Sequence, residues 1–94
     1  MYRIVILYEQ APDAEGYVEH VERFCQPPAG GVFRHGKITG AAIGEPAHAY
    51  YAEFEFAEKQ AFDEFVRSDQ FRGAGGDVME RGWKLSAVEF AELA

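Results

Sequence analysis

The fold of this 94-residue chain is decided by two stretches, Arg3-Ile-Val-Ile-Leu-Tyr8 and His48-Ala-Tyr-Tyr-Ala-Glu-Phe-Glu-Phe56. Both are rich in β-branched or aromatic residues and are bounded by turn-forming or polar segments, which is typical of strands. Alternate residues of the first are apolar on both sides, as in a strand covered on both faces. One side of the second consists of Tyr50, Ala52, Phe54 and Phe56.

Apolar residues at helical spacing occur both before and after the stretch 48–56. Asp13 is the predicted N-cap of a helix that extends to about Gln26, where Pro27-Pro28 ends it. The buried stripe of this helix comprises Tyr17, Val21, Phe24 and Cys25. A second helical segment spans 58–67, and Ser68 is the predicted N-cap of a further short helix that contains Phe71, Ala74 and Val78.

Two more strands complete the predicted fold. One covers 32–40 and is weakened or bulged at Gly36, and the other covers 83–90. The order β-α-β-β-α-β predicts an α+β, ferredoxin-like domain over residues 1–94. Right-handed crossovers place the helices on one face of a four-stranded antiparallel sheet and leave the other face open.

Aromatic residues are numerous for so small a core: the chain contains 8 Phe, 5 Tyr and 1 Trp. Some of them are therefore predicted to lie on the open sheet face, where a second copy of the chain would cover them. The aromatic residues assigned to that face are drawn from Tyr2, Tyr8, Tyr51, Trp83 and Phe90. The sequence thus predicts a homodimer that forms through the open face.

Composition excludes several classes of function. The net charge of −7 disfavours binding to nucleic acid, and no apolar run approaches the ~20 residues of a membrane span. Without a recognisable signal peptide, the chain is expected to be cytoplasmic. The single cysteine excludes an internal disulfide, and the histidine spacing does not favour a metal site. No motif for a phosphate, flavin or haem is present, so no cofactor is expected.

His20 is the leading candidate for chemistry, because imidazole exchanges protons near neutral pH. It lies at the edge of the first helix's buried stripe, and a partly exposed histidine without a chemical role fits the same spacing. Cys25 is about 140° away around the helix, so the two make a poor nucleophilic pair and a buried, inert thiol is the simpler interpretation. Glu53 and Glu55 lie on one strand face, where carboxylates are usually solvated or paired across strands.

The first helix also carries a family resemblance. Tyr17-Val-Glu-His-Val-Glu-Arg-Phe-Cys-Gln-Pro27 resembles the aromatic-x-x-His-(Tyr or apolar)-x-x-x-His-x-Pro segment of the EthD family, named for ethyl tert-butyl ether degradation. Cys25 occupies the place of the second histidine of that segment. The resemblance implies the fold of the dimeric α+β barrel superfamily, with a cleft between each sheet and its helices.

Two functions are compatible with this resemblance. The first is an enzyme of small apolar or aromatic metabolite degradation, of a cofactor-independent oxygenase (oxidoreductase), isomerase or decarboxylase type, with His20 as the catalytic residue. Its expected substrate-binding residues are Tyr17, Phe24, Cys25, Tyr50 and Asp77. The second is a non-catalytic homodimeric module that binds a ligand or another protein, which the replacement of the second histidine by Cys25 favours.

Overall fold

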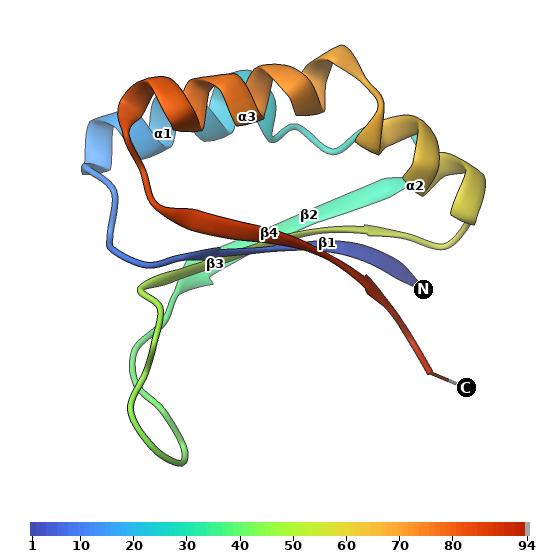
Figure 1. Cartoon of the computed structure of the whole chain (residues 1–94). Coiled ribbons are helices and arrows are strands. Elements are labelled where there is room, and N and C mark those ends of the chain that lie inside the picture. The colour runs from blue at the N-terminus through green and yellow to red at the C-terminus, as the bar shows by residue number, and fades with distance from the viewer. Residues whose placement is uncertain (94) are drawn as a thin grey trace.

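The computed structural model describes residues 1–93, and over these residues a four-stranded antiparallel sheet is covered on one face by three helices (Figure 1). The strands are β1 (Tyr2–Tyr8), β2 (Gly31–Lys37), β3 (Tyr50–Phe56) and β4 (Leu85–Ala91). The helices are α1 (Ala14–Phe24), α2 (Lys59–Val66) and α3 (Asp69–Arg81).

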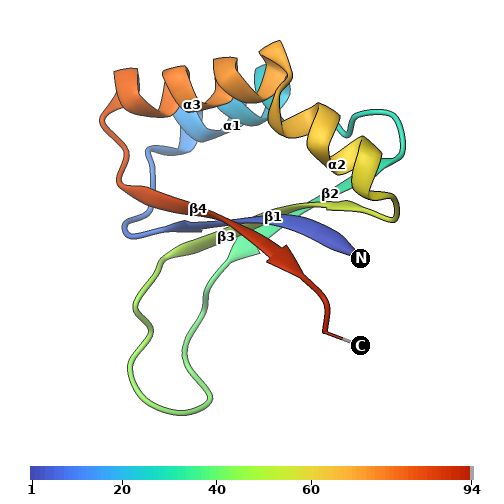
Figure 2. The ribbon, with the colours of Figure 1, turned by 45° about the vertical axis from the view of Figure 1, so that its right-hand side comes forward.

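The strand order is β2-β3-β1-β4, with β1 in the centre between β3 and β4. Figure 2 shows all the labelled helices on the same side of the sheet, with α1 and α3 next to each other. This arrangement confirms the predicted α+β, ferredoxin-like class. It also places β2 and β4 at the two edges of the sheet.

The helix starts follow the sequence prediction. The Asp13 carboxylate accepts a hydrogen bond from the Gly16 backbone N–H at 2.8 Å, and the Ser68 hydroxyl accepts one from the Phe71 N–H at 3.2 Å. The predicted end of the first helix is about two residues too late. Helix α1 ends at Phe24, and the N–H of Cys25 donates to the Val21 carbonyl as the helix terminates.

All four strands differ from the prediction by one to three residues at one end or both, and two of these differences have a clear physical reason. β2 ends at Lys37 without a bulge, since Gly36 pairs with Tyr51 in an unbroken register. Trp83 lies outside β4, because Gly82 terminates α3 in the left-handed conformation (φ 73°) directly after Arg81 and the Trp83 N–H donates back to the Val78 carbonyl. Trp83 therefore belongs to the helix end and faces the space beneath α3.

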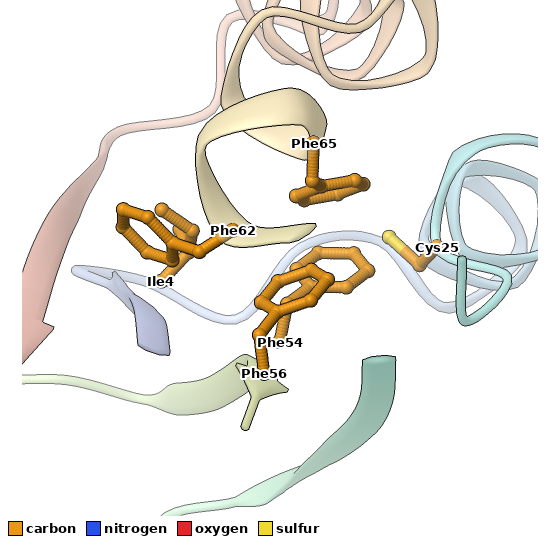
Figure 3. Packing of buried hydrophobic residues seen from close by; sticks show 6 residues of the cluster. All are labelled: Ile4, Cys25, Phe54, Phe56, Phe62 and Phe65. Carbon is orange, nitrogen blue, oxygen red and sulfur yellow. The ribbon is translucent and has the colours of Figure 1, made fainter. Parts of the chain in front are cut away.

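The hydrophobic core lies between the sheet and the helices (Figure 3). Phe54 and Phe56, both 1% exposed, project from β3 towards α2. The Phe54 ring centroid lies 4.5 Å from that of Phe65 and 4.8 Å from that of Phe33. The core consists of Ile4, Cys25, Phe54, Phe56, Phe62 and Phe65.

Two of the five aromatic residues from which the open face was predicted to draw do lie on the opposite sheet face. Tyr51 and Phe90 lie there, in the cross-strand register of Leu7 and Arg3. Tyr2, Tyr8 and Trp83 lie on the helix side instead, because Tyr2 and Tyr8 share the strand face of Ile4 and Trp83 is not in a strand. Their rings contact Phe62, Tyr17 and His20, respectively.

A charge cluster crosses the middle of this face. Arg3 Nε donates to Glu55 at 2.8 Å, and Arg34 lies 3.5 Å from Glu55 and 3.7 Å from Glu53. These contacts agree with the cross-strand pairing expected for the two glutamates. Val5 and Val88 lie beside the cluster as direct cross-strand partners, so the face combines apolar side chains with a largely paired set of charges.

Candidate functional site

A cavity of about 340 Å³ lies between α1, α3 and the strands β1, β3 and β4. Its closed end is formed by Tyr8, His20, Cys25 and Phe54, each at most 5% exposed. Its α3 wall includes Phe71, Ala74 and Val78, the apolar positions that the sequence assigned to this helix. The size and mostly apolar lining are those of a site for a small molecule.

His20 is buried at the closed end and is only 3% exposed. Its Nδ1 is 2.8 Å from Oδ2 of Asp77, so α1 and α3 each contribute one member of a histidine–carboxylate pair. The alternative of a partly exposed histidine is therefore wrong. Packing of α3 against α1 produces this burial, which the helical spacing of α1 alone does not specify.

Asp77 remains ionised at neutral pH. Burial raises its pKa, but the hydrogen bonds from Arg81 and His20 and the positive charge of Arg81 outweigh burial and hold the pKa below its usual value. An ionised carboxylate only accepts hydrogen bonds, so His20 must carry the proton on Nδ1. In the neutral ring, Nε2 is then a proton acceptor available to a ligand.

Arg81 fixes the outer side of this pair. Its Nε donates to Asp77 at 2.8 Å, its Nη2 donates to Glu19 at 2.9 Å, and its guanidinium lies 5.3 Å from the centroid of the Trp83 ring. The Trp83 ring in turn meets His20 edge to face at 5.4 Å. Neither Arg81 nor Trp83 was predicted to belong to the site, although the i, i+4 spacing of Asp77 and Arg81 was a signal for their pairing.

Cys25 lines the same closed end and has no disulfide partner. Burial raises the pKa of its thiol to about 12. The thiol is therefore protonated at neutral pH, in agreement with the interpretation of a buried, inert cysteine.

Alkylation tests this state of Cys25. We expect iodoacetamide at pH 8 to label the native protein at least a hundredfold more slowly than the urea-unfolded protein, because the native thiolate fraction is about a thousandfold lower than that of an ordinary thiol. Mass spectrometry of timed samples measures both rates. Equal rates would show that Cys25 is an accessible thiolate.

The other predicted binding residues lie behind the cavity wall. Tyr17 packs against Tyr8 at 5.8 Å and Tyr50 at 5.0 Å, and its hydroxyl lies 2.7 Å from Nδ1 of His35. Phe24 packs against His20 at 5.6 Å. The structure thus brings His20, Cys25 and Asp77 together, while Tyr17, Tyr50 and Phe24 support the residues that face the cavity.

Tyr8 lines the cavity in place of Tyr17 and Tyr50. Its position on the strand face of Ile4 and Ile6 was the available signal, because that face points towards the helices. Burial raises the pKa of the Tyr8 hydroxyl well above its usual value, so this group is neutral.

Residues 1–93 contain no group of three or more histidine, cysteine, aspartate or glutamate side chains arranged to hold a metal ion. Among the same residues, none of the helices has the length and apolar character needed to cross a bilayer.

No protein-family model matches the chain, and no curated protein matches it by sequence. Among solved structures, an EthD family protein from Bacillus halodurans is similar over 99% of both chains, with a TM-score of 0.74 and 21% identity. A dimeric ferredoxin-like protein of unknown function from Thermobifida fusca gives a TM-score of 0.69 at 16% identity, covering 97% of this chain and 90% of that one.

A second dimeric ferredoxin-like protein of unknown function, from Jannaschia, is similar over 97% of this chain and 98% of its own, with a TM-score of 0.66 and 17% identity. At these identities the likeness concerns the fold. The comparisons support the resemblance to the EthD family structurally: the chain has the fold of an EthD family protein.

Proposed function

We propose that the cavity binds a small, largely apolar molecule and that His20, held by Asp77, acts on it as a general base. The observation that carries this proposal is the His20–Asp77 hydrogen bond of 2.8 Å at the closed end of a mostly apolar cavity. A buried histidine oriented by an ionised carboxylate is a common arrangement for proton transfer. Arg81 holds Asp77 in place and acts as a positioning residue.

The residues around His20 restrict the chemistry. Tyr8 and Cys25 are neutral, so His20 is the one group lining the described cavity that exchanges protons readily near neutral pH. A single base supports removal of a proton from a hydroxyl or an activated C–H and its return at another atom. Isomerisation of a small apolar or aromatic metabolite needs nothing else, and we favour it over the oxygenase and decarboxylase types.

We also propose that the chain is a member of the EthD family and forms a homodimer through the open sheet face. The fold and the first-helix segment support the family assignment, and two of the structures similar to this chain are of dimeric proteins. Val5, Tyr51 and Phe90 provide apolar surface on that face. A free, buried Cys25 fits the reducing cytoplasm, the compartment that we propose.

The second candidate function is a non-catalytic homodimeric binding module. The observation that favours it is the neutral Cys25 thiol, which stands where the EthD segment has a second histidine. Without a second group that exchanges protons, the cavity is less suited to catalysis. Its size and lining still suit the binding of a ligand.

Trp83 provides a test of the His20–Asp77 pair, because it is the only tryptophan of the chain and its ring contacts His20. The edge-to-face contact of 5.4 Å makes the emission of Trp83 depend on how the imidazole is held. We expect His20→Asn and Asp77→Asn each to change the emission intensity of the native protein, because either variant removes the hydrogen bond between the imidazole and the carboxylate. His48→Asn serves as the control and should leave the emission unchanged. Emission that is the same in His20→Asn and the native protein would contradict the described contact.

Hydrogen exchange tests the catalytic role separately. Phenolic and enolisable ketone compounds, incubated with the protein in D2O, should gain deuterium at an activated carbon at a rate that Asp77→Asn or His20→Asn lowers roughly a hundredfold or more. Nuclear magnetic resonance measures the incorporation. Binding of these compounds without any exchange would support the binding module instead, and absence of binding would contradict both candidates.

A further inference from the structure

The residues that line the cavity are not distributed evenly between its two ends. The groups with polar atoms Tyr8, His20 and Cys25 are all at the closed end and almost fully buried. Gly75 and Met79 of α3 and Ala87 of β4 line the cavity and are exposed, Met79 to 82%. The cavity is therefore polar at its closed end and apolar at its mouth.

The mouth lies between α3 and the edge strand β4. Figure 1 and Figure 2 both show α3 above β4, and Gly75 and Met79 stand one helical turn apart on α3. Ala87 lies in register with Ile6, which places it on the helix side of the sheet. A Cβ atom added to Gly75 would meet nothing within 4 Å, so the glycine leaves open space at this point.

The closed end sets the chemistry of the group that it accepts. Nδ1 of His20 donates to Asp77, so Nε2 of the neutral ring can accept a hydrogen bond from a ligand. A hydroxyl group of the ligand can donate this hydrogen bond. A carboxylate group has no proton to donate and would need a cation beside it, but Arg81 already binds Asp77 and Glu19.

We propose that the substrate is a neutral amphiphile with a hydroxyl group, which binds with the hydroxyl at His20 and its apolar tail in the mouth beside Gly75. Gly75 is then the residue that determines which tail lengths the cavity accepts. This inference rests on the proposed function, since it concerns the same cavity. The inference adds the orientation of the substrate in the cavity and the chemical class of the substrate. Phenols with an alkyl chain opposite the hydroxyl are members of that class.

A series from 4-methylphenol to 4-octylphenol tests this direction, with Trp83 fluorescence as the binding signal. In the native protein, affinity should rise about three- to fourfold with each methylene until the tail passes the mouth, and then level off. The corresponding methyl ethers, which lack the donor, should bind roughly fivefold more weakly or worse. Both effects follow from a hydroxyl at the closed end.

Two glycine variants separate the mouth from the rest of α3. Gly75→Leu should weaken binding of the longer phenols roughly tenfold or more and change the shorter ones by less than about twofold, because the leucine side chain occupies the path of the tail. Gly76→Leu is the matched control. A Cβ at Gly76 also meets nothing within 4 Å, but Gly76 does not line the cavity, so this variant should bind the whole series like the native protein.

The outcomes distinguish this inference from the proposed function. If phenols bind but Gly75→Leu and Gly76→Leu behave alike, the tail does not pass Gly75 and the inference is wrong, while the cavity remains a binding site. A steady loss of affinity as the tail grows would show that the tail points to the closed end. If no phenol or ether changes the Trp83 signal, while other compounds bind and show His20-dependent exchange, the substrate class is wrong and the proposed function stands.

Discussion

Replacing Phe54 by alanine is expected to lower the free energy of unfolding by about 3–5 kcal/mol. The side chain is 1% exposed and packs between the rings of Phe33 and Phe65. Its loss leaves a void that the surrounding aromatic rings cannot fill without moving from their packed positions. Since small domains have a total stability of about 5–15 kcal/mol, this one change removes a large share of it.

Thermal or urea unfolding, followed by circular dichroism at one fixed protein concentration, measures the effect of Phe54→Ala. The melting temperature should fall by more than about 12 °C. Ile43→Ala is the control, because Ile43 is 95% exposed in the segment between β2 and β3 and its truncation should change stability by less than about 0.5 kcal/mol. Similar losses in the two variants would contradict the described core.

Val5→Asp is expected to convert the proposed homodimer into a monomer. Val5 lies in the centre of the open face, in register with Glu53 on one side and Val88 on the other. A new carboxylate there would be buried against the second copy and next to an existing acid, and the two-fold symmetry of a dimer repeats the cost. Burying each new charge costs several kcal/mol, which should outweigh the apolar contacts that Val5 makes in the native dimer.

Sedimentation equilibrium at micromolar concentration shows whether Val5→Asp is a monomer and whether the native chain is a dimer. Ile43→Asp introduces the same charge at an exposed position away from the sheet and should remain dimeric. Circular dichroism should show the same secondary structure in all three proteins. A native chain that sediments as a monomer would disprove the homodimer, and a dimeric Val5→Asp variant would place the interface elsewhere.

The order of elements could be predicted from the sequence because each element carries its own local signal. The alternation of residues 50–56, the cap at Asp13 and the cap at Ser68 depend on neighbours a few positions away, and the structure confirms all three. Strand ends were less predictable. Trp83 looked like a strand residue by alternation, but the left-handed Gly82 and the bond from Trp83 to Val78 assign it to the end of α3.

The candidate site was predicted in part, through His20 and Asp77. Their contact joins residues 57 positions apart, and nothing in the pattern of either helix states that their side chains meet. Tyr17 was expected to bind the substrate because it matches the aromatic residue of the EthD segment, and Tyr50 because its hydroxyl could line a pocket. Tyr8 faces the cavity instead, since the register of β1 places it in front of them.

By itself, the sequence determined which segments form strands and helices and which side of each strand is apolar, and it singled out His20 as the candidate for proton transfer. These properties are local, because they depend on backbone propensity, alternation and the intrinsic acidity of a side chain. The tertiary structure alone decided that α3 packs beside α1, that Asp77 contacts both His20 and Arg81, and that the exposed Gly75 lines the cavity. Those properties arise from contacts between distant residues, whose geometry is fixed only when the helices pack together on the sheet.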